Sequence, residues 1–250
     1  TQISPKSKKI ASIAALICAF NPYNIHFSRG AWETNILTFE LILASYFFYK
    51  YINRQRSKYL FFSAIIFGLS LFTYQAGKMI SLFLIIILFI LNFKQIQFKK
   101  FLLSFVIPLG IIALPVAYGL FFSSNANRLQ VVSLFSYPRF EIETNTIINE
   151  TNHLDYQIFH SQPSFFIRNF LSRYFNHFSP RFLAFEGDWQ NPRHSAPYIG
   201  VLLYPSLIFL VIGLVFGFSR SKNQSINLFF LLWLLVAPIP SALTRDSIQS

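Results

Sequence analysis

The sequence predicts an all-α polytopic membrane protein, with about seven transmembrane helices and one long extracytoplasmic loop that carries an amphipathic surface helix. Of the 250 residues, 54% are hydrophobic and 12% are charged, whereas about 25% of the residues of a soluble domain are charged. Mean hydropathy is +0.47. Two further observations support this class. Apolar runs near the length that a helix needs to cross a bilayer recur along the chain, and basic residues gather in every second connection.

Seven apolar runs are predicted to span the bilayer. In chain order they are Lys9–Phe20, Thr34–Tyr49, Tyr59–Tyr74, Met79–Phe93, Phe101–Phe122, Val201–Phe218 and Ile226–Leu243. The first is short, so we expect its basic flank to snorkel to the surface or the run to belong to a truncated helix. Pro108 and Pro115 are expected to kink or thin the fifth span, which is tolerated where neighbouring groups satisfy the freed carbonyls.

The distribution of charge predicts the orientation. The net charge is +12, and the short connections that hold twelve Lys and Arg residues contain no Asp or Glu: Lys6, Lys8, Lys9, Lys50, Arg54, Arg56, Lys58, Lys94, Lys99, Lys100, Arg220 and Lys222. Basic residues stay on the cytoplasmic side. We therefore expect a multi-pass protein of the cell membrane whose N-terminus is cytoplasmic and whose residue Ser250 is extracytoplasmic, with no nucleic-acid partner.

The segment Ser123–Gly200 is the long loop on the outer side, within a single transmembrane domain of residues 1–250. Its stretch Ser164–His177 places aromatic and aliphatic residues at helical spacing, which predicts the amphipathic surface helix, with Ser164 as its cap. A packed soluble helix inside a subdomain is the alternative. The chain begins with Thr and ends shortly after an apolar run, so we expect an internal fragment and an incomplete domain.

The first outer connection, Asn21–Glu33, and the span after it carry the first candidate residues. Glu33 follows Arg29 by four positions, and Glu40 follows Glu33 by seven, inside a span. Glu33 is the better candidate for a polar site, although an Arg29–Glu33 helical pair could simply be structural. Glu40 could equally be a buried carboxyl bonded to a neighbouring helix. Lys78 lies alone in a short turn, where it could bind a phosphate or snorkel.

The run Tyr174–Gly200 concentrates further chemistry before the next span: His177, Arg181, Glu186, Asp188, Arg193 and His194. No zinc-type spacing links these residues, so no metal ligands are assigned. Glu186 and Asp188 could hold a divalent cation weakly, or bond sugar hydroxyls. Arg181 and Arg193 could clamp phosphates, or Arg–Glu pairs could only fix the loop. Trp189 could stack on a sugar or anchor the interface.

Four stretches together resemble the GT-C polytopic glycosyltransferases. They are NPYNIHFSRGAWETN, the Thr73-Tyr74-Gln75 turn, NHFSPRFLAFEGDWQNPRH and APIPSALTRDS, in that order along nearly the whole chain. The most similar group is related to the protein O-mannosyltransferases and aminoarabinose transferases, a glycosyltransferase family 39-like group. The resemblance rests on order and topology rather than on one specific motif.

The resemblance implies an enzyme that moves a hexose or pentose from a polyprenyl-phosphate donor to a protein, lipid or glycan acceptor on the extracytoplasmic face. Its principal catalytic acid would lie in an earlier outer loop, outside this chain. The implied roles are site lining for Arg29 and Glu33, phosphate contact for Lys78, Arg181, Arg193 and Arg245, and sugar or acceptor contact for Asp188, His194 and Asp246. No cofactor is assigned beyond the divalent cation. A transporter or flippase of a lipid-linked substrate, or a non-catalytic membrane assembly subunit, is the alternative.

Overall fold

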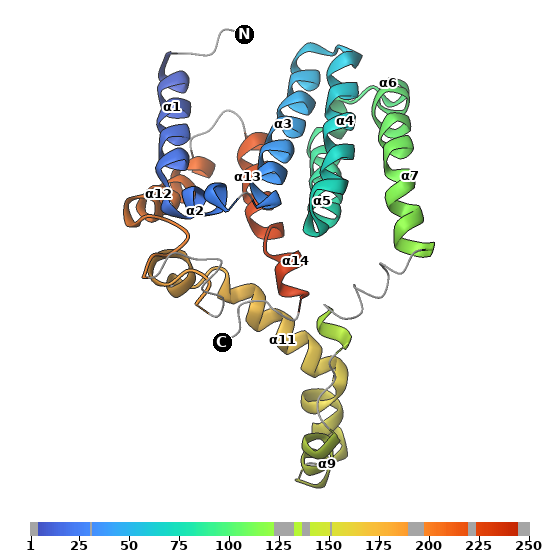
Figure 1. The fold of residues 1–250 in the computed structure, drawn as a ribbon, viewed down its shortest axis with the longest axis vertical. Coiled ribbons are helices and arrows are strands. Elements are labelled where there is room, and N and C mark those ends of the chain that lie inside the picture. Colours follow the sequence, from blue (N-terminus) through green and yellow to red (C-terminus); the bar gives the residue numbers. More distant parts are fainter. Residues whose placement is uncertain are drawn as a thin grey trace.

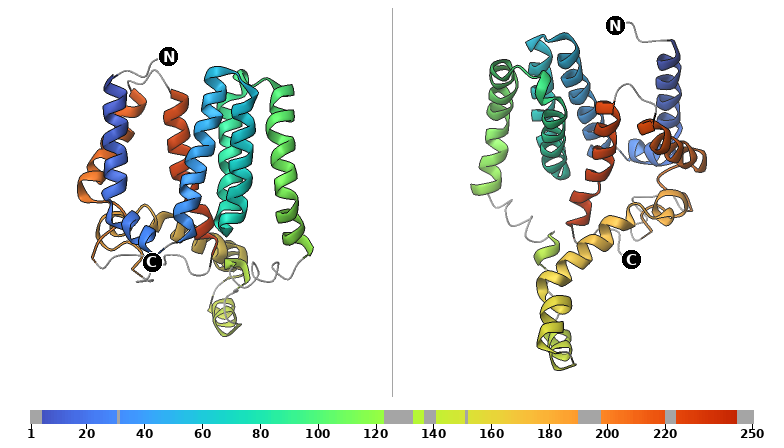
Figure 2. Two further views of the ribbon diagram at one scale, coloured as in Figure 1. Left: turned by 45° about the horizontal axis from the view of Figure 1, so that its top comes forward. Right: turned by 180° about the vertical axis from the view of Figure 1, so that it is seen from behind.

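The computed structural model describes residues 5–30, 32–122, 133–136, 141–150, 152–189, 198–219 and 224–244. In these ranges the chain is mostly helical, and its β pairing is limited to one isolated bridge between Ser133 and Thr244. Long helices stand side by side, and shorter helices lie across one end of them (Figures 1 and 2). The prediction of an all-α chain is confirmed.

The upright helices are α1 (Pro5–Phe20), α3 (Glu33–Arg54), α4 (Ser57–Thr73), α5 (Gln75–Asn92), α7 (Ile107–Phe122), α12 (Tyr204–Ser219) and α13 (Gln224–Val236). The remaining elements are α2 (Pro22–Arg29), η1 (Phe93–Gln95), α6 (Phe98–Phe101), η2 (Leu102–Val106), η3 (Leu134–Ser136), α9 (Glu141–Glu150), α10 (His153–Asp155), η4 (Tyr156–His160), α11 (Gln162–Asn176), η5 (Arg181–Phe185) and α14 (Ile239–Ala242). The π-helix η2 ends two residues before Pro108. Proline has no N–H to donate, and the wider π turn accommodates the hydrogen bond that is missing there.

Three helical segments of the described chain are long and apolar enough to cross a membrane: Gln75–Gln95, Phe98–Leu120 and Gln224–Ala242. A fourth is added if Lys9–Phe20 and Pro22–Arg29, which meet at 58°, form one broken span. Ser57–Thr73 and Tyr204–Val215 are apolar but shorter. The chain is therefore a membrane protein, and the full set of seven spans stays a prediction.

The core lies where α3, α4 and α5 pack together. Leu37, Leu41, Ala44 and Phe48 recur at helical spacing on one face of α3 and are almost fully buried. Small residues let the neighbouring helix approach closely, as is usual between membrane helices. Ser63 of α4, for example, donates a hydrogen bond of 2.8 Å to the carbonyl of Ala44. This rigid core fixes the ends of α3, α4 and α5.

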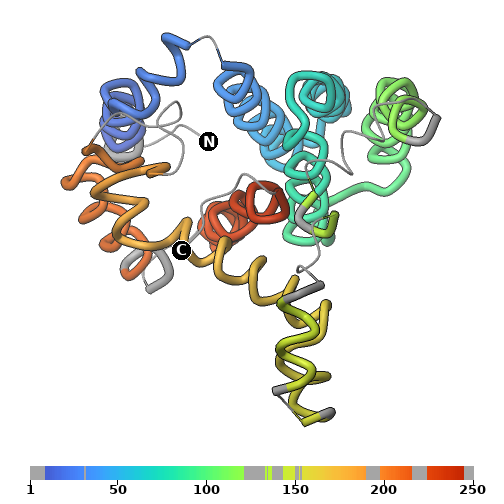
Figure 3. Tube along the Cα trace, turned by 60° about the horizontal axis from the view of Figure 1, so that its bottom comes forward, coloured from blue at the N-terminus to red at the C-terminus, as the bar shows by residue number. Residues whose placement is uncertain are grey.

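Helix α11 crosses the end of the molecule below α13 and α14, as the tube view from that end shows (Figure 3). One face is attached to these helices: Arg173, which is 8% exposed, donates to the carbonyl of Thr244, and the Tyr174 hydroxyl donates to that of Leu235. Ile167, Leu171 and Phe175, spaced four residues apart, are exposed on another face. The helix is thus amphipathic, with one side packed on the protein.

The predicted start of this helix was wrong. The helix begins at Gln162, and its N-cap is Ser161, which forms no side-chain capping bond. Ser164 does not cap the helix, because its hydroxyl donates to the carbonyl of Ile158 at 2.7 Å. Ser164 therefore joins the helix to the π-helix η4 that precedes it.

Candidate functional site

The corner between α1 and α2 is attached to a distant segment by one side chain. Asn21 is 6% exposed, and its Oδ1 accepts a hydrogen bond of 3.0 Å from the amide of Tyr23, which caps α2. Its Nδ2 donates a bond of 2.9 Å to the carbonyl of Val201, just before α12. Asn21 thereby holds the connection between α1 and α2 against the end of the long loop.

Residues 200–202 are attached in turn to η5. The amides of Gly200, Val201 and Leu202 donate to the carbonyls of Ala184, Phe182 and Leu183. A Cβ added at Gly200 would lie 2.4 Å from the carbonyl carbon of Ala184, so a side chain would disrupt this contact. The loop that carries Arg181 and Asp188 is therefore held between α2 and α12.

Arg29 and Glu33 belong to different helices. Helix α2 ends at Arg29 and α3 begins at Glu33, so the alternative of one helical pair is wrong. A Cβ added at Gly30 would lie 2.0 Å from Nε1 of Trp32, so glycine allows the indole ring to fold back over the break. Both Arg29 and Glu33 are exposed.

Glu33 and Lys78 line the same pocket. This pocket has a volume of about 290 Å³ and lies where α4 turns into α5 at the N-terminal end of α3; its lining residues are Glu33, Leu71, Phe72, Thr73, Tyr74, Gln75 and Lys78. Lys78 lies in the first turn of α5 rather than in a turn between helices, because Tyr74 alone connects α4 to α5. The Nζ of Lys78 donates a bond of 2.7 Å to Oε1 of Gln75. We refer to this space as the Glu33–Lys78 pocket.

A glycine shapes the wall of this pocket. A Cβ added at Gly77 would lie 2.6 Å from the carbonyl oxygen of Ser70 and 2.8 Å from Cδ1 of Leu37. Glycine therefore allows the start of α5 to approach both α4 and α3. The first turn of α5, which carries Lys78, therefore lies against both helices.

Glu40 is linked to the pocket from within the helix bundle. The Thr73 hydroxyl, which belongs to a residue of the pocket lining, donates a bond of 2.7 Å to Oε2 of Glu40. For Glu40, the hydrogen bond to a neighbouring helix is therefore present, but the carboxyl is half-buried rather than buried. The sequence singles out Thr73 only as part of the Thr73-Tyr74-Gln75 turn and not as the partner of Glu40, because the two residues are 33 positions apart.

His177 connects α11 to α14. Its Nδ1 lies 2.7 Å from the carbonyl oxygen of Arg173, and its Nε2 lies 3.1 Å from Oγ of Ser241. Burial lowers the pKa of His177 below its ordinary 6.5, while the Arg173 carbonyl and the negative charge of Asp188 act in the opposite direction. The charge of Asp188 also acts on Tyr23 of α2. The structure thus places Asp188 near both α2 and the end of α11.

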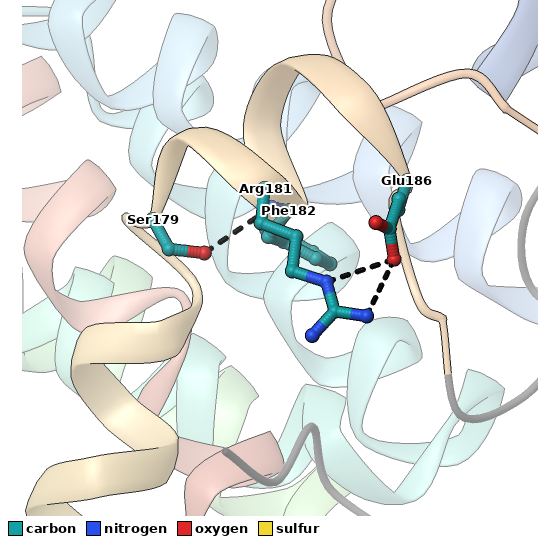
Figure 4. Close-up of polar contacts among 4 residues, drawn as sticks. All are labelled: Ser179, Arg181, Phe182 and Glu186. Carbon is teal, nitrogen blue, oxygen red and sulfur yellow. Dashed lines mark hydrogen bonds and ion pairs between the residues drawn. The ribbon is translucent and has the colours of Figure 1, made fainter.

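Arg181 is already engaged by its own loop, as Figure 4 shows. Its Nη2 lies 2.7 Å from Oε2 of Glu186, its Nε donates to the same oxygen, and its guanidinium lies 4.2 Å from the ring centroid of Trp189. The two charged side chains are 53% and 43% exposed, so this pair contributes about 0–1 kcal/mol. These contacts favour the alternative in which the Arg181–Glu186 pair holds the loop in place. Phosphate binding by Arg181 stays a prediction.

Four predicted site residues lie outside the described residues: Arg193, His194, Arg245 and Asp246. In the described ranges, no group of three or more His, Cys, Asp or Glu residues could hold a metal ion. The divalent cation therefore stays a prediction.

Residues 6–118 match the family model of the dolichyl-phosphate-mannose-protein mannosyltransferases. Over these residues the chain is similar to a GT-C membrane glycosyltransferase. The match covers a little under half of the chain, from α1 to α7, and so includes Arg29, Glu33, Glu40 and Lys78. Searches of curated proteins and of solved structures found no match. The matched family implies a membrane glycosyltransferase that uses polyprenyl-phosphate sugar donors.

Proposed function

We propose that this GT-C-like protein transfers a sugar from a polyprenyl-phosphate donor to an acceptor hydroxyl on the extracytoplasmic face, and that the reaction takes place at the Glu33–Lys78 pocket. The observation that carries the proposal is that a carboxylate and a cation line one pocket inside the segment that matches the mannosyltransferase family. A sugar transfer of this kind needs a cation where the phosphate leaves and a carboxylate where the acceptor hydroxyl loses its proton.

The distribution of charge supports an extracytoplasmic pocket. Helix α3 runs from Glu33, at the pocket, to Arg54, at the opposite end. That opposite end also holds the basic connections that follow α3 and α5. Because basic connections stay in the cytoplasm, the Glu33–Lys78 pocket opens toward the other side of the membrane.

The proposed chemistry needs no group beyond donor, acceptor and side chains. The acceptor oxygen bonds to the anomeric carbon as the bond from that carbon to the phosphate oxygen breaks, and the electron pair leaves with the phosphate. The Lys78 ammonium stabilises the charge that develops on the phosphate. The Glu33 carboxylate orients the acceptor hydroxyl and takes its proton. The site-lining role of Arg29 and the contacts from Arg181 and Asp188 stay predictions, because none of these three residues is among the lining residues of the pocket.

Sugar transfer by the full-length protein in proteoliposomes tests the proposal, with radiolabelled polyprenyl-phosphate sugars as donors. We expect Glu33→Gln and Lys78→Gln each to slow transfer by about 10²–10³-fold, the usual loss when one transition-state group is removed. Glu143→Gln is the control, because Glu143 is exposed on α9, away from the pocket. Equal transfer rates in the wild type, the two pocket variants and the control would reject the pocket as the site of transfer. Movement of labelled lipid across the bilayer without transfer would favour a transporter.

The same assay separates the two interpretations of Arg181. If Arg181 only fixes its loop, Arg181→Gln and Glu186→Gln should slow transfer to a similar extent, because each removes the same contact. If Arg181 binds the donor phosphate, Arg181→Gln should raise KM for the donor well above the value for Glu186→Gln. Adding and removing EDTA in these reactions tests whether a divalent cation takes part.

A further inference from the structure

The end of the bundle opposite the Glu33–Lys78 pocket is a basic surface. It is formed by the end of α3, the connection to α4, and the segment from η1 to α6. It carries Lys50, Arg54, Arg56, Lys58, Lys94, Lys99 and Lys100. Most of these side chains are exposed. The sequence has no Asp or Glu from Leu41 to Phe140 to neutralise them. We refer to these seven residues as the basic platform.

Two hydrogen bonds hold the two halves of the basic platform together. Gln55, in the left-handed conformation at φ 52°, ends α3, and its Nε2 donates a bond of 3.1 Å to the carbonyl of Gln95. The amide of Gln97 donates a bond of 3.2 Å to the hydroxyl of the buried Tyr51. The loop after α3 and the loop after α5 are therefore one surface, and their charges act together.

An apolar pocket lies beside these charges. Its volume is about 480 Å³, and its lining residues are Phe89, Ile90, Leu91, Asn92, Phe93, Lys94 and Gln95. Ile90 and Phe93 are exposed large apolar residues, and Lys94 is the cation of the lining. The pocket thus combines an apolar wall along the last turn of α5 with a positive charge at its end.

Lys50 indicates where this surface meets the membrane interface. Its Nζ lies 5.0 Å from the ring centroids of both Tyr46 and Tyr59, and it donates a bond of 3.1 Å to the Tyr46 hydroxyl. Tyrosine rings and lysine stems of this kind gather at the level of lipid head groups. The pocket of α5, at the same end of the bundle, is therefore at the depth where a phosphate joins its acyl chains.

We propose that the basic platform binds an anionic phospholipid, with its phosphate at Lys94 and the neighbouring cations and its acyl chains along Ile90 and Phe93. Charge complementarity carries this assignment, because a cluster of Lys and Arg without acidic residues attracts anionic head groups. The lipid occupies the leaflet opposite the Glu33–Lys78 pocket. This inference does not depend on the proposed sugar transfer.

Native mass spectrometry of the full-length protein tests this proposal after extraction from nanodiscs of equal phosphatidylglycerol and phosphatidylcholine. We expect the wild type to retain phosphatidylglycerol preferentially and to lose this preference at high salt. Each neutralised cation should weaken retention about fivefold, so Lys94→Gln with Lys99→Gln should remove most of it. Lys94→Arg with Lys99→Arg, which keeps the charge, should retain it and thereby controls for folding.

The control outside the platform is Arg168→Gln, which removes an exposed charge from α11 at the other end of the molecule. It should leave lipid retention unchanged. Equal retention of both phospholipids by the wild type, or an unchanged preference after the two Lys→Gln changes, would overturn the proposal. Nanodiscs that also contain a polyprenyl phosphate test the source of the phosphate, because displacement of phosphatidylglycerol by that lipid would overturn the assignment to a phospholipid.

Discussion

Substitution of Asn21 should loosen the attachment of the long loop by a predictable amount. Asn21→Ala removes the cap of α2, which is worth about 1 kcal/mol. It also removes the donor to the Val201 carbonyl, at about 1–2 kcal/mol for a partly buried bond. The free energy of unfolding should therefore fall by about 2–3 kcal/mol. For a chain of this size, we expect Tm to fall by about 5–10 °C.

Asn21→Asp separates these two contributions. The carboxylate still accepts the bond from the amide of Tyr23, but it cannot donate to the carbonyl of Val201. Its Tm should therefore lie between those of the wild type and Asn21→Ala. Hydrogen exchange of the amides of Val201 and Leu202 should accelerate in both variants, because these amides are bonded to η5.

Thermal unfolding in one detergent, together with hydrogen exchange, measures both effects. A Tm for Asn21→Asp equal to that of the wild type would show that the bond to Val201 contributes nothing. A Tm equal to that of Asn21→Ala would show that the cap of α2 contributes nothing to stability. Unchanged exchange at Leu202 in both variants would contradict the role of Asn21 in holding the loop.

Three further predictions follow from the site. Thr73→Val should lower the free energy of unfolding by about 1–2 kcal/mol, because Glu40 loses its donor. In a double-mutant cycle with Glu40→Leu, additive changes in Tm would show that the hydrogen bond between the two side chains contributes nothing. Gly77→Ala should raise KM for the donor by displacing the start of α5, whereas Gly110→Ala, with open space around its Cβ, should not; equal KM values for the two variants would count against the close contact. The pKa of His177 is lowered in the folded protein, so the unfolded chain binds more protons and the free energy of unfolding should fall as the pH decreases through 6.5. His177→Gln should make Tm depend less on pH in this range. An unchanged slope of Tm against pH would contradict this role of His177.

Hydropathy and charge predict the helices of this protein well, because a membrane requires continuous apolar runs. The predicted bounds miss the first turns. The third and fourth runs, Tyr59–Tyr74 and Met79–Phe93, were expected to be joined by a turn at residues 75–78, but α5 begins at Gln75. A helix in its first turn needs no apolar side chain, so hydropathy does not detect it. The residues of this turn are also those that line the Glu33–Lys78 pocket.

The candidate site is predictable only in part. Glu33 and Lys78 were identified by residue type and by their predicted position on the outer side, but their shared pocket depends on how α3 packs against α5. Asn21 and Thr73 were missed as partners, because Val201 and Glu40 lie 180 and 33 positions away. The Asn-Pro pair at Asn21 is the local signal that could have indicated a helix cap. The contact with Val201 has no local signal.

The measurement that tests the central claim most directly is the rate of sugar transfer by Glu33→Gln, Lys78→Gln and the variant that carries both changes. Groups that act together on one reaction give losses that do not multiply. We therefore predict that the double variant transfers sugar about as slowly as the slower single variant. Losses that multiply, or rates equal to that of Glu143→Gln, would contradict a reaction at the Glu33–Lys78 pocket.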